Sequence, residues 1–505
     1  MNLRLNNGPS EFHSRIVKRA VVFLISAFLV SVLANGQVNL NKIPISYDDV
    51  PAELHPWLQQ QGINRENFAD HISTIRQNTD ERERMGEYDH LIFFLLQSSR
   101  FTSHPRVEPA ISAYDFVHKL DQSKRKKLLA EESRFIPSEN EIPKSVKARM
   151  ADFIKAIKSQ TGDDIRLSHF NNLLIKAKGP DLSIEEKLLA EYSRAMRFLY
   201  LKEFASREIK QTEVAAYVAS LYQSRGHSTD TQIEANFAVN TALIMLKALR
   251  ASTESITPSF KLNKVLIVGP GLDFAPRTDL IDLFGPQSYQ PFAVADALIS
   301  LKLADESRLQ IHCVDINERV LAYLQNLRRQ EKVSLFIVSG VKDNLANPLA
   351  EDFKSYFREF GRNIGDESRL ALPDQISSHL SKSLLIRPEI IRTISADRLN
   401  IIVERYQNSP HYDLVIVTNV FPYFNQSELL FALTNIAAMI TDGGYFIHNE
   451  LQTIPPEFIA PLGLPLQQAR TVMISSDKTA PLFDGVAIHR KSPKAVSSKV
   501  SGKDH

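Results

Sequence analysis

The spacing of apolar residues changes near residue 260. Upstream, apolar positions recur with the 3.6-residue period of an amphipathic helix. Ser183 and Glu186 have the spacing of a capping box, in which a hydroxyl is followed three residues later by a carboxylate. The apolar stripe after this box comprises Leu188, Leu189, Tyr192, Met196, Leu199 and Tyr200. A second helix is expected from about Asp230. The pattern predicts a separate, all-helical domain over residues 37–252.

Downstream, short β-branched runs alternate with helical stretches. Strands are expected at 265–268, 309–314, 390–394, 414–418 and 445–448, and helices at 291–303, 318–329, 396–406 and 427–440. Such alternation predicts the α/β class, with a doubly wound, mostly parallel sheet. Two further runs, at 470–475 and 485–490, predict an antiparallel hairpin at the end of the sheet.

The domain predicted over residues 255–490 is interrupted near 342–387, where a helical insertion is expected. The last residues, 491–505, carry four lysines among serines and are expected to be a disordered tail.

The first 36 residues have the order of a secretory signal peptide. Arg15, Lys18 and Arg19 precede an apolar run at 20–34, and Ala34-Asn35-Gly36 supplies small residues for cleavage. The run is shorter than the ~20 residues that span a bilayer comfortably. Export to the periplasm or the cell exterior is therefore expected, with an uncleaved N-terminal anchor as the alternative. No other transmembrane segment is expected.

The composition excludes several classes of site. Lys and Arg number 60 and Asp and Glu 58 in 505 residues, so no global charge favours a nucleic acid partner. Cys313 is the single cysteine and lies in an apolar run, so no intramolecular disulfide is expected and a small buried side chain is. The histidines upstream of residue 250 show no metal-binding spacing. We expect no metal site.

Two features suggest a ligand at the carboxyl edge of the sheet. Gly269-Pro270-Gly271 directly follows the first strand, where glycine allows a sharp bend and close approach to a ligand. An ordinary turn explains this motif equally well. Asp315 ends the second strand, where a carboxylate can accept hydrogen bonds from ribose hydroxyls. The alternative for Asp315 is a helix N-cap, a role that Asn317 can also fill.

Two later segments add candidates. Asp397 follows the third expected strand and can receive an adenine amino group, although an N-cap explains it about as well. Asn419 follows the fourth strand, and the aromatic residues after it, Tyr423 among them, can shield a reacting group from water. Packing of these aromatics in the core is the alternative. Tyr423, His448 and Glu450 are the candidates for a base.

Taken together and in this order, these segments resemble the class I S-adenosylmethionine-dependent methyltransferases. The glycine bend is similar to their first motif, and Asp315 and Asp397 to their ribose and adenine acids. The segment from Thr418 to Phe424 is similar to one segment of the chemotaxis protein-glutamate methyltransferases. The terminal hairpin fits as well, because the family's sheet ends with an antiparallel strand. The resemblance covers residues 262–490.

The resemblance implies S-adenosylmethionine as the cofactor and methyl transfer to an unidentified small molecule or protein. It implies cofactor contacts by a set of five residues and a catalytic role for two, Asn419 and Tyr423. The cofactor set is Gly269, Gly271, Asp315, Asp397 and Asn419.

Departures from the family pattern leave two other functions open. Ile267 stands where the family has an acid, Asp273 stands in place of a third glycine, and Asp315 follows Gly269 by 46 residues. A non-catalytic exported protein that keeps the fold as a binding module is one alternative. A nicotinamide-dependent oxidoreductase is the other, because a glycine bend and a ribose acid serve either cofactor.

Overall fold

The computed structural model describes residues 41–493 apart from nine short internal segments. These segments are 131–134, 160–163, 177–181, 254–260, 275–282, 373–376, 408–411, 452–453 and 477–480. The expected signal peptide or anchor, the predicted boundary near residue 255 and nearly all of the expected tail lie outside the described residues. Contacts divide the chain into one unit over Met1–Asn41 and a second over Lys42–His505, to which the helices and strands belong.

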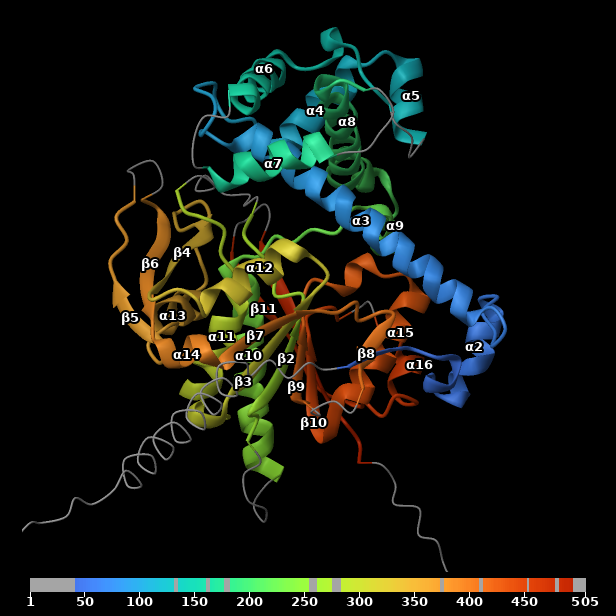
Figure 1. The fold of residues 1–505 in the computed structure, drawn as a ribbon, viewed down its shortest axis with the longest axis vertical. Coiled ribbons are helices and arrows are strands. Elements are labelled where there is room, and N and C mark those ends of the chain that lie inside the picture. The colour runs from blue at the N-terminus through green and yellow to red at the C-terminus, as the bar shows by residue number, and fades with distance from the viewer. Residues whose placement is uncertain are drawn as a thin grey trace, which may run out of the picture. The chain divides into compact units, whose positions relative to one another are not determined.

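Residues 55–253 are mostly helical, as the sequence pattern predicted. The Ser183 hydroxyl accepts a hydrogen bond from the Glu186 amide and begins a long helix, α8, which confirms the expected capping box. The helices are α2 (His55–Gln60), α3 (Phe68–Gln97), α4 (Pro109–Lys119), α5 (Gln122–Ala130), α6 (Lys144–Ser159), α7 (Ile165–Lys176), α8 (Ile184–Glu203), α9 (Val214–Ser224) and α10 (Ile233–Thr253). Figure 1 shows α4 to α8 together above the sheet.

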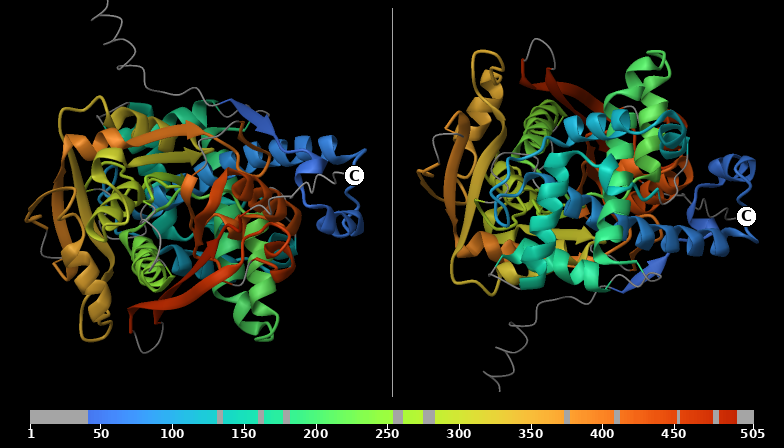
Figure 2. Two further views of the ribbon diagram at one scale, coloured as in Figure 1. Left: turned by 90° about the horizontal axis from the view of Figure 1, so that it is seen from below. Right: turned by 90° about the horizontal axis from the view of Figure 1, so that it is seen from above.

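The main sheet has seven strands among the described residues, in the order β7-β3-β2-β9-β10-β12-β11. Its members are β2 (Lys264–Val268), β3 (Gln310–Asp315), β7 (Ile394–Arg398), β9 (Tyr412–Val417), β10 (Ile440–His448), β11 (Leu466–Ser475) and β12 (Leu482–Arg490). The first five are parallel, and β12 runs antiparallel to both β10 and β11. This confirms the mostly parallel sheet and its terminal antiparallel hairpin (Figures 1 and 2).

Helices follow the parallel strands: α11 (Gln290–Ser300), α12 (Glu318–Leu327) and α15 (Gln426–Met439), with a short α16 (Pro456–Ile459) before β11. Every residue of β9 is buried, and so are four of the five in β2. Strands covered on both faces read as continuous apolar runs, which is why they could be located well from sequence.

The prediction for residues 390–406 was wrong. The expected strand at 390–394 is the helix α14 (Pro388–Thr393), and β7 begins where it ends. Part of the expected helix at 396–406 is β7, and β8 (Glu404–Tyr406) pairs with β1 (Lys42–Pro44). Ile390 and Ile391 favour a strand because they are β-branched, but Pro388 begins a helix that buries both.

The insertion is also different from the expectation of a helical segment. Its strands β4 (Val333–Lys342), β5 (Gly365–Ser368) and β6 (His379–Ile386) form a three-stranded antiparallel sheet, with one helix, α13 (Glu351–Glu359), between β4 and β5. Burial in β4 alternates residue by residue, which is the pattern of a strand with one covered face. Serine and lysine in β6 obscure the same signal in the sequence.

The helical segment shares its apolar core with the sheet. One cluster of buried residues extends from Leu91 of α3 to Ile488 of β12. Helix α10 packs against α11, β11 and β12, because apolar side chains on most of its circumference are buried. The helical part is therefore not a separate body, and it can contribute residues to a site at the sheet edge.

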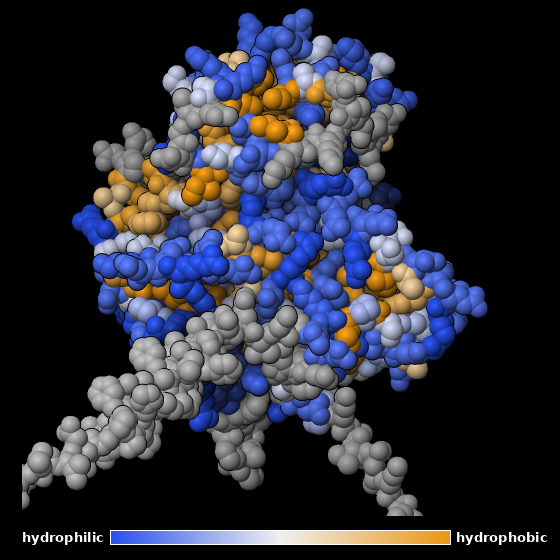
Figure 3. Space-filling model, viewed as in Figure 1, coloured by the Kyte–Doolittle hydropathy of each residue, from blue (hydrophilic) through white to orange (hydrophobic). Residues whose placement is uncertain are grey.

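The face of the molecule in Figure 3 is mostly polar, with apolar side chains among the helices at the top, at the left edge and in smaller patches across the middle and on the right. No helix in the described part of the chain combines the length and apolarity that a membrane crossing requires.

Candidate functional site

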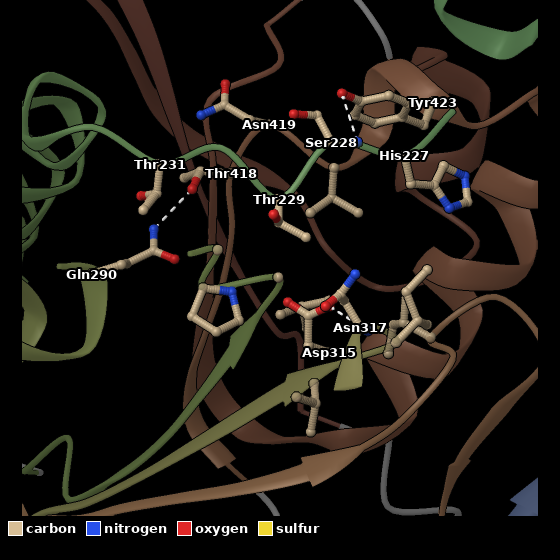
Figure 4. Close-up of a pocket in the computed structure, with 18 of the residues that line it drawn as sticks. His227, Ser228, Thr229, Thr231, Gln290, Asp315, Asn317, Thr418, Asn419 and Tyr423 are labelled. Carbon is tan, nitrogen blue, oxygen red and sulfur yellow. Dashed lines mark hydrogen bonds between the residues drawn. The ribbon is translucent and has the colours of Figure 1, made fainter. Parts of the chain in front are cut away.

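A pocket of about 950 Å³, a volume that includes its open mouth, lies at the carboxyl ends of β2, β3 and β9. From β2 the chain continues to β3 on one side, whereas β9 joins on the other side. Ligands of doubly wound sheets bind at such a switch point. Figure 4 shows the loops after these strands together with a segment that precedes α10.

The glycine bend forms one wall of the pocket. Gly269 and Gly271 have φ angles of +67° and +73°, which favour glycine. A Cβ atom on Gly271 would lie 2.9 Å from the Thr229 carbonyl oxygen, and one on Gly269 would lie 2.7 Å from Cγ2 of Val420. The bend therefore needs glycine for contacts within the protein itself.

Most amides of the bend are used internally. The Gly269 amide donates to the Val314 carbonyl at 2.8 Å, and the Leu272 amide to the Thr229 carbonyl at 2.7 Å. The Asp273 amide donates to the Gln287 carbonyl at 2.8 Å. Fewer amides than the sequence suggested are left for a ligand.

Asp315 lies at the end of β3 and lines the pocket. Its Oδ1 atom accepts a hydrogen bond from the Asn317 amide at 2.9 Å. Asn317, and not Asp315, caps α12, because its side chain accepts from the Arg319 amide at 3.0 Å. Burial raises the pKa of Asp315 to about 6. The structure thus leaves this carboxylate facing the pocket, as the ribose hypothesis requires.

Asn419 follows β9 and also lines the pocket. Its φ of +58° is in the left-handed region, which asparagine tolerates better than most residues. Its amide donates to Asn449 Oδ1 at 2.9 Å, and Asn449 Nδ2 donates back to Asn419 Oδ1 at 2.9 Å. Next to it, Thr418 Oγ1 accepts from Gln290 Nε2 at 2.8 Å (Figure 4). This corner of the pocket is held rigidly.

Tyr423 is brought to the same pocket by a 3-10 turn, η7 (Phe421–Tyr423). Its ring packs edge to face against His227 and Tyr222, at centroid distances of 5.4 and 5.8 Å. Its hydroxyl accepts a hydrogen bond from the Ser228 amide at 3.4 Å (Figure 4). Of the aromatic residues after Asn419, Tyr423 and Phe424 line the pocket, whereas Phe421 is buried in the core, as the alternative expected.

Asp397 is not among the residues that line the pocket. It lies within β7, where its Oδ2 bonds to His312 Nε2 at 2.9 Å, and this contact lowers the pKa of Asp397. Because the strand lies four residues later than expected, residues 399–402 form the pocket wall there. Asn400 is the polar residue of that wall, and its Oδ1 accepts from the Ile402 amide at 3.1 Å.

His448 and Glu450 do not line the pocket either. The Nε2 atoms of His448 and His489 lie 2.9 Å apart, and burial lowers the pKa of His448 to about 3. Cys313 is buried, as expected from its apolar surroundings. Within the described part of the chain, no cluster of His, Cys, Asp and Glu side chains could hold a metal ion.

The helical segment also lines the pocket, which the sequence did not predict. Thr79 and Glu83 of α3 contribute, as do residues 227–231 between α9 and α10. Burial raises the pKa of Glu83 to about 7. The ring nitrogens of His227 are buried without a hydrogen-bond partner in the described structure, and burial lowers the pKa of His227 to about 3. In the sequence, Gly226 marks a loop directly before residues 227–231, but glycine is equally common in loops that bind no ligand.

The pocket is lined by carboxylates and not by cations. Glu83, Asp230 and Asp315 contribute side chains, whereas none of the described lining residues is Lys or Arg. His227 is neutral at pH 7 because its pKa is lowered. Glu83, with a pKa of about 7, is only about half ionised at neutral pH, so the negative charge of the lining is smaller than three carboxylates would give, but it still favours a ligand with positive charge.

No protein-family model matches the sequence, and no curated protein matches it. Several solved structures do. The N-methyltransferase NodS from Bradyrhizobium japonicum WM9, in complex with S-adenosyl-L-homocysteine, aligns over 50% of this chain and 86% of its own, at 11% identity and a TM-score of 0.25. Magnesium protoporphyrin IX methyltransferase from Synechocystis PCC 6803, with bound S-adenosylmethionine, aligns over 58% and 94%, at 8% identity and a TM-score of 0.24.

A TehB-like S-adenosylmethionine-dependent methyltransferase from Corynebacterium glutamicum aligns over 50% of this chain and 99% of its own, at 12% identity and a TM-score of 0.23. The strand order and the pocket geometry of this chain itself are the stronger guides to its function.

Proposed function

We propose that this chain is an S-adenosylmethionine-dependent methyltransferase that acts on a small molecule or a protein side chain. The observation that carries the proposal is the convergence of three parts of the chain on one acid-lined pocket. These parts are the bend at Gly269–Gly271, the carboxylate of Asp315 and the rigid corner at Asn419.

The charge of the pocket distinguishes this cofactor from a dinucleotide. A dinucleotide carries a pyrophosphate, which binds to cations or to the N-terminus of a helix that begins at the glycine bend. Here no described lining residue is Lys or Arg, Leu272 to Phe274 are not helical, and α11 begins only at Gln290. S-adenosylmethionine has no phosphate, and its sulfonium and ammonium groups outweigh its single carboxylate, so its net charge is positive. The nicotinamide alternative is therefore the weaker one.

Each part of the pocket suits a different part of the cofactor. Asp315 would accept hydrogen bonds from the ribose hydroxyls, and the wall at 399–402 would line the adenine, with Asn400 in the place first expected for Asp397. Gln290, Thr418 and Asn419 offer polar groups for the amino acid end. Bound S-adenosylmethionine would supply an electrophilic methyl group for in-line displacement. Tyr423 would exclude water and orient the acceptor, so that catalysis is mainly positioning.

One observation favours the non-catalytic alternative. The amides of Gly269, Leu272 and Asp273 bond within the protein, and Gly271 makes its close approach to Thr229 and not to open space. A protein that keeps the fold for binding alone could tolerate such a crowded bend. Export would point the same way, because S-adenosylmethionine is made in the cytosol.

Calorimetric titration tests the proposal. We expect S-adenosylhomocysteine and S-adenosylmethionine to bind the full chain in the micromolar range and NAD to give no heat. Binding of NAD alone would establish the oxidoreductase alternative. If none of the three ligands produces heat or a thermal shift, the non-catalytic alternative stands.

Export remains a proposal that rests on residues 1–36. A reporter fused after residue 60 and expressed with and without these residues measures it: secreted or membrane-associated signal is expected only when they are present. Cytosolic signal from both fusions would contradict export and remove the objection to a cytosolic cofactor.

A further inference from the structure

Helices α3, α8 and α9 enclose a second cavity, here called the arginine groove. It is a groove of about 1740 Å³, including the space open to solvent, and it shares no lining residue with the pocket. The two are neighbours, because Phe424 lines the pocket and the next residue, Asn425, lines the groove. Gln223 of the groove donates a hydrogen bond to the Phe424 carbonyl at 3.3 Å.

Four arginines line this groove: Arg82, Arg194, Arg197 and Arg225. Two of them are neutralised within the protein. Arg194 pairs with Asp89 at 2.9 Å and with Glu191 at 2.8 Å, and Arg225 pairs with Asp89 at 3.2 Å.

The other two donate to backbone carbonyls. Arg82 bonds to the carbonyl oxygens of Arg225 and Tyr222, at 3.0 and 3.1 Å. Arg197 Nη2 donates to the Leu129 carbonyl at 3.2 Å. Among the described residues, Arg197 has no carboxylate within ion-pair distance.

Two buried donors of α8 lack acceptors. Nε of Arg197 and Oγ of Ser193 are both buried without a hydrogen-bond partner in the described structure. They are four residues apart, so they lie on the same face of the helix, and both residues line the groove. Buried donors without acceptors are rare, because the lost hydrogen bond is costly. An oxyanion that bonds to both would remove this cost.

The rest of the lining is mixed. Glu81, Glu191 and Glu428 belong to it together with amide and hydroxyl side chains, and it also has an apolar part. Met85, Leu128, Phe198 and Leu221 belong to this apolar part. The ring of Phe198 also stacks under Arg225, at 4.4 Å from the guanidinium carbon to the ring centroid. A ligand whose anionic head meets the two donors would place an apolar body against this part of the lining.

We propose that the arginine groove binds the acceptor substrate by a carboxylate or phosphate group, and that the apolar body of the substrate extends toward Tyr423. The identification of the ligand as an acceptor rests on the proposed methyltransferase function, whereas anion binding in the groove does not. Because glutamates line the groove as well as arginines, the anion would be selected by the unpartnered donors of Arg197 and Ser193 and not by the net charge of the groove.

Binding of matched ten-carbon probes to the full chain, without cofactor, tests this proposal. Decanoate and decyl phosphate are expected to bind and decylamine is not, because only the first two offer an oxyanion. Which of the two binds more tightly identifies the head group. Arg197→Met keeps the apolar stem and should weaken the better probe by about 10-fold or more, since a charge-assisted hydrogen bond is lost. Ser193→Ala should weaken it less.

The controls separate a site from general effects. Arg76→Met removes a cation that is exposed on α3 and outside the groove, and it should leave probe affinity unchanged. Arg197→Lys should restore part of the affinity. Equal binding of decanoate and decylamine, or an affinity that Arg197→Met and Ser193→Ala both leave unchanged, would overturn the proposal. Titration of the same variants with S-adenosylhomocysteine should show unaltered affinity, so failure of the groove and failure of the cofactor pocket give different results.

Discussion

The two cavities of this chain are built from different parts and are lined by different charged groups: the pocket has carboxylates without Lys or Arg among its described lining residues, whereas the groove has both arginines and glutamates. The pocket lies where strands end, and its walls are short loops held by hydrogen bonds such as the Asn419–Asn449 pair. The groove lies between helices and is lined by long arginine side chains. Loops at a sheet edge place backbone and short side chains accurately, whereas helices present long cations to a wider space. The first arrangement suits a cofactor of fixed shape, and the second a substrate held at one point by an anionic group.

Replacement of Asp315, the proposed ribose ligand, should show the largest difference between ligand binding in the pocket and in the groove. Asp315→Ala is expected to weaken S-adenosylhomocysteine binding by about 100-fold or more, or about 2.7 kcal/mol, because two hydrogen bonds to a carboxylate are lost. Binding of decanoate or decyl phosphate in the groove should not change. Calorimetry measures both.

Asp397→Ala is the matched control for this change, since that carboxylate is outside the pocket. It should leave cofactor affinity within about 2-fold, a difference of ~0.4 kcal/mol. A loss as large as that of Asp315→Ala would restore the adenine role first expected for Asp397.

The glycine bend allows a second comparison, between two glycine substitutions and their effects on the free energy of unfolding. Gly271→Ala should lower the free energy of unfolding by about 2–3 kcal/mol, because the methyl group would meet the Thr229 carbonyl in addition to the cost of a positive φ. Gly62 also has a positive φ, but a Cβ atom there would meet nothing within 4 Å. Gly62→Ala should therefore lower the free energy of unfolding by only about 1 kcal/mol. Urea unfolding measures the difference, and equal losses would contradict the contact with Thr229.

The last comparison concerns how the free energy of unfolding depends on pH. The folded-state pKa of Asp315 is about 6, above its ordinary 3.8, so the folded chain holds this proton more tightly than the unfolded chain does. The stability due to Asp315 is therefore present below pH 4 and is lost as the pH rises through 6. Asp315→Asn has no charge to bury and should be more stable than the natural chain by about 1–2 kcal/mol at pH 7.5.

At pH 4 this advantage should disappear, because Asp315 is then largely protonated in the folded chain and about half protonated in the unfolded one. Thermal melts of the two chains at pH 4, 6 and 7.5 measure it. An advantage that is the same at all three values would show that Asp315 is not buried as a charge. Gain of stability with loss of cofactor binding would mark Asp315 as a residue retained for its ligand.

The success of prediction from sequence differed between the parts of the chain. Strands covered on both faces, such as β2 and β9, were located well because their apolar runs are continuous. The hairpin of β11 and β12 was also found, although most of β11 is exposed, because turn residues separate its two runs. Residues 390–406 were assigned wrongly because Ile390 and Ile391 have strand propensity but are placed by tertiary packing. The small sheet was missed because serine and lysine in β6 obscure its alternating pattern.

The candidate site likewise contains residues that could be predicted from the sequence and residues that could not. Gly269, Gly271, Asp315, Asn419 and Tyr423 meet in one pocket, because each follows or ends a parallel strand that could be located from sequence within a few residues. Asp397 was misplaced with its strand. Glu83 and His227 could not be found, since they reach the pocket only through packing of helices that are distant in sequence.

A crystal structure with S-adenosylhomocysteine tests the central claim most directly. We expect both ribose hydroxyls within hydrogen-bond distance of the Asp315 carboxylate, the adenine against residues 399–402 and the sulfur near Asn419 and Tyr423. A ligand bound elsewhere, or side chains of α3 and the 227–231 segment filling the pocket in place of the ligand, would contradict it.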